Sequence, residues 1–281
     1  MENLIELFNF GFFRNAVIAA FIASITCGII GTYIVSRRIV FISGGITHAS
    51  FGGIGMGYYF GFDPILGAIV FGILSALGIE FFTKRADLRE DSAIAMLWSL
   101  GMALGVIFIF LTPGYAPNLM SYLFGNILTV SKGELIYLFL LAVFVIGFFV
   151  IFYRMIIFVS FDEEFALTNN APVRLFNALL ISLVALTIVL NIRVVGIILV
   201  MSLLTIPQAI ANLFTKRFDI MMLYSILFGF LGSVTGLAFS YIYDIPSGAS
   251  IIFTLVVLYG LIKILFLAIG KAKSKGQMAK A

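Results

Sequence analysis

Residues 41–57 read FISGGITHASFGGIGMG, an apolar stretch that is dense in glycine and carries the only histidine of the chain, His48. On a helix, small residues would share one face at every fourth position, namely Gly45, Ala49, Gly53 and Gly57. Such a ladder lets two helix backbones approach closely within lipid. The stretch therefore predicts a tightly packed membrane helix with one ionisable side chain beside its packing face.

The rest of the chain has the composition of a membrane protein. Of its 281 residues, 62% are hydrophobic and 11% are charged, and the mean hydropathy is +1.18. Soluble domains carry about 25% charged residues, so this chain cannot build a water-exposed surface. Apolar segments near the roughly 20 residues that cross a bilayer recur at 15–36, 45–60, 63–82, 92–112, 133–153, 175–191, 194–214, 219–242 and 248–270. We predict a single all-α polytopic domain over residues 1–281, with nine transmembrane helices, or eight and a re-entrant or tilted segment at 45–60.

The basic residues indicate how these segments alternate across the membrane. If all nine cross, one side receives nearly every Lys and Arg, and the other side receives Arg14, Lys132 and Arg193. The positive-inside rule assigns the richer side to the cytoplasm. The N-terminus is then outside and the basic tail 271–281 is cytoplasmic. The pI near 9.2 thus reflects topology and gives no indication of nucleic-acid binding.

His48 is the first candidate for a functional residue. Ionisable groups inside a membrane usually face the protein interior or a water-filled path, and neutral imidazole is a common transition-metal ligand. The hydroxyls of Ser43 and Thr47 are nearby, five positions and one position before His48. Two interpretations remain open from the residues alone: a transient metal contact made by His48 with Ser43 and Thr47, or a buried histidine that only joins two helices.

A second polar pattern lies in the segment 194–214. Four side chains spaced 4, 3 and 4 residues apart would share one helical face: Met201, Thr205, Gln208 and Asn212. Pro207 lies in the middle of this segment, where proline removes a backbone hydrogen bond and can kink a helix. The stripe is expected to line a translocation path. The alternative is that each residue simply forms hydrogen bonds between helices.

The cytoplasmic loop after the fifth segment reads FVSFDEEFALTNNAPVRLF. Ser160 and Glu163 match the S-x-x-E capping box, and Pro172 suits a helix stop. A short helix is therefore expected at about 161–168. An acidic, aromatic helix on the cytoplasmic face favours docking to a soluble partner over resting on an anionic leaflet. The docking residues would be Asp162, Glu163, Glu164, Phe165 and Ala166.

The motifs of common enzymes do not occur in the sequence. It contains no G-x-x-x-x-G-K-[ST], no H-E-x-x-H and no G-x-S-x-G, so it has no Walker A loop, zinc-protease helix or nucleophile elbow. A transport subunit that binds no cofactor and depends on a separate motor fits this chain better than an enzyme does.

Five stretches together carry a family resemblance: SRRIVFISGGITHASFGGIG, REDSAIAMLWSLGMALGVIF, SYLFGNIL, FDEEFALTNNAP and RVVGIILVMSLLTIPQAIANL. In this order they resemble the membrane permease subunit of bacterial ABC importers for zinc, manganese or iron(II), the ABC-3 family. The resemblance implies a fold similar to vitamin B12 and siderophore importers and a place in the bacterial cytoplasmic membrane. It also implies a permease homodimer, two ATPase subunits that hold ATP and magnesium, and an extracytoplasmic metal-binding protein. The helix at 161–168 would be the coupling helix.

The resemblance also bears on His48. This residue matches the histidine of the family pattern D-A-x-S-H, in which the aspartate and histidine resemble metal contacts. Here the sequence reads GGITH, so Gly44 stands where the family has aspartate and one carboxylate is missing. Two alternatives remain: an ABC permease for a metal chelate, and a gradient-driven secondary cation transporter. The second would need a membrane carboxylate, and no acid lies at mid-depth of the nine segments.

Overall fold

The computed structural model describes residues 9–113, 125–161, 163–168 and 172–278, and all the regular structure in these ranges is helical. The elements are α2 (Gly11–Ser36), α3 (Val40–Phe60), α4 (Pro64–Arg85), α5 (Glu90–Leu111), the 3-10 turn η1 (Ile127–Thr129), α7 (Lys132–Phe161), α8 (Glu163–Thr168), α9 (Val173–Val195), α10 (Ile197–Leu203), α11 (Ile206–Phe214), α12 (Phe218–Tyr243) and α13 (Ser247–Met278).

Eight spans within the described residues are long and apolar enough to cross a membrane: α2, α4, α5, α7, α9, α10 with α11, α12 and α13. The ninth predicted segment is α3. It has 21 residues, but its many glycine and hydroxyl residues make it less apolar than these eight spans. The prediction of an all-helical membrane protein with eight or nine spans is confirmed.

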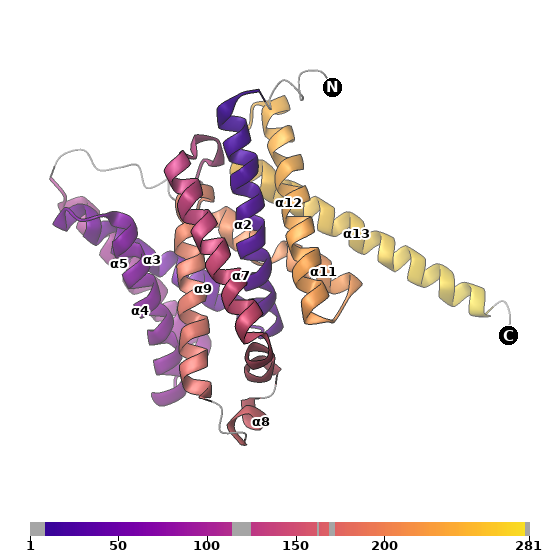
Figure 1. Ribbon diagram of the computed structural model, residues 1–281, viewed down its shortest axis with the longest axis horizontal. Helices are drawn as coiled ribbons and strands as arrows, with labels where there is room; N and C mark the ends of the chain where they lie inside the picture. The colour runs from indigo at the N-terminus through magenta and orange to yellow at the C-terminus, as the bar shows by residue number, and fades with distance from the viewer. Residues whose placement is uncertain (1–8, 114–124, 162, 169–171, 279–281) are drawn as a thin grey trace.

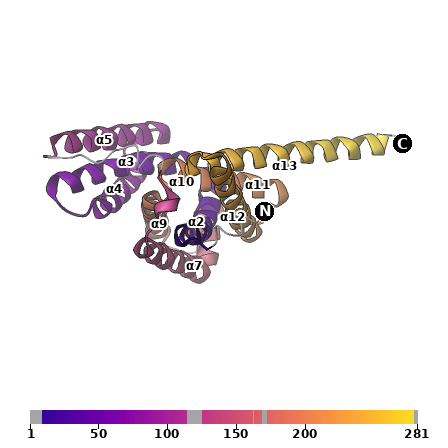
Figure 2. The same cartoon turned by 90° about the horizontal axis from the view of Figure 1, so that it is seen from above.

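The helices form an elongated bundle (Figure 1). At one end α3 packs between α4 and α5, and α4 contacts α9. The middle is built around α2, which contacts α7 and α12. α13 packs against α12 at its start and then extends away from the bundle, as the view from above shows (Figure 2). The short α8 lies at the end of the bundle opposite to the turn between α12 and α13 (Figure 1).

The glycines of α3 explain its central place between two helices. A Cβ atom added at Gly53 would lie 2.0 Å from the carbonyl oxygen of Gly67 on α4. On the other side, a Cβ atom at Gly101 of α5 would lie 2.4 Å from the Cα atom of Ala49. Backbones that approach this closely need small residues at the crossing. The predicted ladder of small residues is therefore confirmed, and it serves two neighbouring helices.

The turn that reverses the chain after α3 is also encoded locally. Gly61 has φ +76°, a conformation that glycine adopts without steric cost. Asp63 then caps α4, because its side chain accepts a 2.8 Å hydrogen bond from the backbone N–H of Ile65. Pro64 occupies the first position of the helix, where its missing N–H is not needed.

Two local predictions need correction. The segment 194–214 is not one kinked helix, because α10 ends at Leu203, the chain departs from helical dihedrals at Thr205, and Pro207 lies in the first turn of α11. The loop helix begins at Glu163, since Phe161 still belongs to α7. Ser160 consequently lies inside α7, and its hydroxyl is buried without a hydrogen-bond partner in place of capping α8.

Candidate functional site

His48 projects from α3 toward α5, where its ring stacks on the indole of Trp98. The two ring centroids are 4.1 Å apart and the planes are nearly parallel, with an angle of 6°. The imidazole is half-buried, and its buried Nδ1 atom has no hydrogen-bond partner among the described residues. A buried nitrogen that lacks a partner is costly in a folded protein, by about 1–3 kcal/mol. Its lone pair or N–H is thus available to a ligand.

One turn before His48, the missing side chain at Gly44 leaves room for two neighbours. A Cβ atom at Gly44 would lie 3.1 Å from the terminal methyl carbon of Met201 and 3.8 Å from atom Cζ3 of Trp98. Three helices, α3, α5 and α10, therefore meet around the position at which the family pattern has a carboxylate. The cluster contains an imidazole, an indole and a thioether side chain.

The hydroxyls of Ser43 and Thr47 are directed to their own helix. Ser43 donates a 2.6 Å hydrogen bond to the carbonyl oxygen of Val40, and Thr47 donates to that of Ser43. Both side chains are fully buried. Their oxygen lone pairs could still accept, but in this conformation the structure gives no contact between either hydroxyl and His48.

The polar stripe is divided by the break between α10 and α11. Met201 reaches the His48 cluster, whereas Thr205 donates a 2.9 Å hydrogen bond to the carbonyl oxygen of Met201. Gln208 is fully buried, and its amide donates to the carbonyl oxygen of Cys27 on α2 at 2.8 Å. Asn212 lies in the last turn of α11 and accepts a 2.8 Å hydrogen bond from Lys216. Of the four residues, Met201 is the one that lies against Gly44, one turn before His48.

The predicted coupling residues lie in or near α8. Asp162 lies outside the described residues, and so do the side chains of Glu163, Glu164 and Phe165, although their backbone forms the helix. Ala166 is described and buried, and it joins an apolar cluster with Val159, Val173 and Phe176. This cluster fixes α8 to the adjacent ends of α7 and α9.

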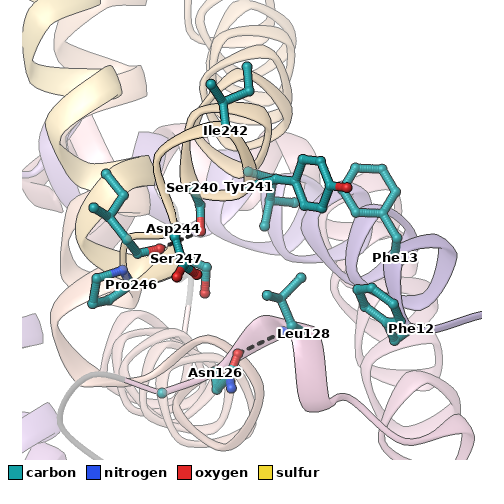
Figure 3. Close-up of a pocket in the computed structure, with 13 residues that line it drawn as sticks. Phe12, Phe13, Asn126, Leu128, Ser240, Tyr241, Ile242, Asp244, Pro246 and Ser247 are labelled. Atoms are coloured by element: carbon teal, nitrogen blue, oxygen red, sulfur yellow. Dashed lines mark hydrogen bonds between the residues drawn. The ribbon is translucent and has the colours of Figure 1, made fainter. Parts of the chain in front are cut away.

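A large cavity, of about 970 Å³, opens at the opposite end of the bundle from α8 (Figures 1 and 3). The cavity lies between the start of α2, η1 and the turn from α12 to α13. Asp244, which ends α12 in a left-handed conformation, is one of its lining residues. Ser240 donates a 2.6 Å hydrogen bond to the carbonyl oxygen of Ile245 along its wall. None of the predicted site residues lines this cavity. Within the described ranges, no three His, Cys, Asp or Glu side chains gather as a metal-binding group.

Comparison with known proteins places the chain in a family. It belongs to the ABC 3 transport family, whose model matches residues 9–266. A relative from Halalkalibacterium halodurans, the manganese transport system membrane protein MntC, is 34% identical over 91% of this chain and 88% of its own. The predictions of the family and of a transport subunit that is not itself an ATPase are confirmed. Membership in an ABC family excludes the gradient-driven secondary transporter.

Solved structures agree with this fold. PsaBC from Streptococcus pneumoniae, solved in complex with Fab, matches with a TM-score of 0.83 at 30% identity, over 92% of this chain and 95% of that chain. The inward-facing conformation of a metal-chelate type ABC transporter matches with a TM-score of 0.70 at 18% identity, over 90% and 85%. The second likeness concerns the fold alone, and it confirms the predicted similarity to importer permeases of that architecture.

Sequence reasoning did not find Trp98. The residue lies fifty positions after His48 on a different helix, and no spacing rule connects the two. The one available signal was that Trp98 is the only tryptophan in the chain, placed inside an apolar segment. The sequence likewise did not indicate that Met201 would lie over Gly44.

Proposed function

We propose that this chain is the permease of an ATP-driven importer for a divalent transition metal, with manganese as the first candidate cargo. The observation that carries the proposal is the His48 cluster, a half-buried imidazole with an unpartnered nitrogen at the meeting point of three membrane helices. Family membership supports it, as does the likeness to a manganese transport protein. Neutral imidazole suits zinc and iron(II) as well.

In this proposal the metal passes His48 on its way through the membrane. No carboxylate belongs to the cluster, so a divalent ion is held there by few donors and leaves readily, as transit requires. Ser43 and Thr47 are proposed to contribute only if their hydroxyl oxygens turn toward the ion. In the polar stripe, Met201 lines the path beside this cluster. Thr205 and Asn212 line the path closer to the cytoplasm. Gln208 serves packing in this conformation, because its amide is engaged with α2.

The chain is further proposed to work as a homodimer with two copies of an ATPase subunit, which carry ATP and magnesium. α8 is the proposed coupling helix, since it is held to α7 and α9 through Ala166 at one end of the bundle. An extracytoplasmic metal-binding protein would dock at the other end, where the large cavity opens. This arrangement corresponds to an outside N-terminus and a cytoplasmic tail 271–281 in the bacterial cytoplasmic membrane.

The test is uptake of labelled manganese, zinc and iron(II) into proteoliposomes that hold the permease, its ATPase and its binding protein. Uptake should require ATP and should fall at least tenfold in His48→Ala, because the one imidazole on the path is removed. Phe110→Ala serves as the matched control, since Phe110 is an aromatic side chain that is 87% exposed on α5. Metal uptake that ignores ATP, or that His48→Ala leaves at the wild-type rate, would refute the proposal.

A further inference from the structure

The imidazole of His48 has no hydrogen bond to orient it at its buried nitrogen. In most protein metal sites, the ring nitrogen that does not bind the metal donates to a carboxylate, carbonyl or water, and this bond fixes the ring orientation. Here Nδ1 is buried and unpartnered. The imidazole ring instead stacks on Trp98, with centroids 4.1 Å apart and planes 6° from parallel.

A parallel stack restrains the ring in a different way from a hydrogen bond. Rotation of the imidazole about its χ2 bond would drive ring atoms into the indole face, so the stacked plane is the one that persists. The indole is itself supported, because α5 and α3 are in backbone contact at Gly101 and Ala49. Gly101 lies three residues after Trp98, and Ala49 directly follows His48. The close helix crossing thus determines the distance between the two rings.

Gly44 completes the arrangement. A Cβ atom there would lie 3.8 Å from the edge of Trp98 and 3.1 Å from Met201, so the indole edge and the thioether methyl fill the space beside Gly44.

We propose that Trp98 is a positioning residue for metal passage, which holds the plane of the His48 imidazole so that a nitrogen is presented to the ion. This inference rests on the proposed function of His48 as a metal contact. Trp98 contributes no ligand atom. Its aromatic face replaces the hydrogen-bonding partner that orients histidine at other metal sites.

The first test compares Trp98→Ala and Trp98→Phe with Phe110→Ala in the ATP-dependent uptake assay. Loss of an orienting partner typically weakens metal affinity by about 10- to 100-fold. Trp98→Ala is therefore expected to raise KM for manganese by about tenfold while the maximal rate stays within about twofold. Trp98→Phe keeps a planar face and should restore KM to near the wild-type value. Phe110→Ala removes an exposed aromatic from the same helix and should leave both parameters unchanged.

The second test uses the fact that Trp98 is the only tryptophan of the chain, so its fluorescence reports directly on the stack. The purified wild-type permease is titrated with manganese chloride, and quenching should saturate. In His48→Ala the saturating part should vanish, because the ion no longer binds beside the indole. This titration remains informative even where Trp98→Ala assembles poorly with the ATPase.

The outcomes separate the two proposals. If His48→Ala abolishes uptake but Trp98→Ala behaves like Phe110→Ala, the positioning role is wrong and the proposed function stands. The positioning role is equally wrong if manganese quenching does not saturate or if it is the same without His48. If the wild-type complex fails to transport metal, or if His48→Ala transports normally, the proposed function itself is wrong.

Discussion

The crossing of α3 and α4 permits a prediction whose size follows from the coordinates. A Cβ atom at Gly53 would lie 2.0 Å from the carbonyl oxygen and 2.3 Å from the carbonyl carbon of Gly67. Ordinary van der Waals contact begins at 3.4 Å, so Gly53→Ala leaves a shortfall of about 1.4 Å between 3.4 and 2.0 Å. Both obstructing atoms belong to the backbone, and no side chain can rotate out of the way.

Overpacked cores lose about 1–3 kcal/mol, and more where neighbours cannot move. We therefore expect Gly53→Ala to lower the free energy of unfolding by about 3 kcal/mol, the upper end of that range. The same displacement would move α3 relative to its neighbours and reduce metal uptake. Gly67→Ala should have a similar effect, because its Cβ atom would lie 2.2 Å from the carbonyl oxygen of Gly53.

The assay is reversible unfolding of the purified permease in mixed micelles, followed by the ellipticity at 222 nm (a standard helix signal). Gly147→Ala is the matched control. Among the described residues, no side chain and no atom of another helix lies within 4 Å of the Cβ position at Gly147, and alanine favours a helix over glycine by up to about 1 kcal/mol. If Gly53→Ala unfolds at the same denaturant concentration as Gly147→Ala, then α3 and α4 are not packed backbone to backbone and the argument fails.

Three further substitutions test separate parts of the molecule. Gly44→Asp should raise manganese uptake relative to zinc uptake severalfold in a competition assay, because a carboxylate suits manganese and the flexible Met201 side chain can move aside. Gly44→Asn adds no charge and should leave the ratio of manganese to zinc uptake unchanged. Ala166→Leu overfills the apolar cluster beneath α8, so the number of metal ions transported per ATP hydrolysed should fall while ATPase activity persists. Gln208→Leu removes the hydrogen bond that the Gln208 amide donates to the carbonyl oxygen of Cys27 and should lower the free energy of unfolding by about 1–3 kcal/mol. The same unfolding titration measures this, and equal stability of wild type and variant would contradict it.

The sequence predicted the helices well because their signals are local. Apolar length sets a membrane span, and small residues at every fourth position set a close crossing. Each of these signals depends on residues within a few positions of one another. The break at Thr205 was missed for a related reason: the spacing of the polar stripe assumes a continuous helix, and a proline can either kink a helix or begin a new one.

The site was predicted only in part, because its contacts join distant segments. The spacing along the chain puts Gln208 and Met201 on the same predicted helical face. In the structure, however, Gln208 is buried against Cys27, 181 positions away. Met201 instead reaches Gly44, where a glycine leaves the space. Which polar residue of a stripe faces a path and which one binds a neighbouring helix is decided by packing, and periodicity alone does not contain that information.

The absence of a side chain at Gly44 has a consequence for the proposed transport that follows from electrostatics. An acid beside His48 would attract a divalent cation strongly in the low-dielectric interior and would slow its release. If His48 contacts the metal as proposed, a neutral imidazole without that charge would hold the ion weakly, and a fixed orientation of the ring would be more important for capture during transit. Trp98 provides such a restraint without adding charge. Gly44 and Trp98 would then act together, and Gly44→Asp should make metal uptake less sensitive to the loss of the indole. Trp98→Ala should therefore raise KM for manganese by a smaller factor in the Gly44→Asp background than in the wild type.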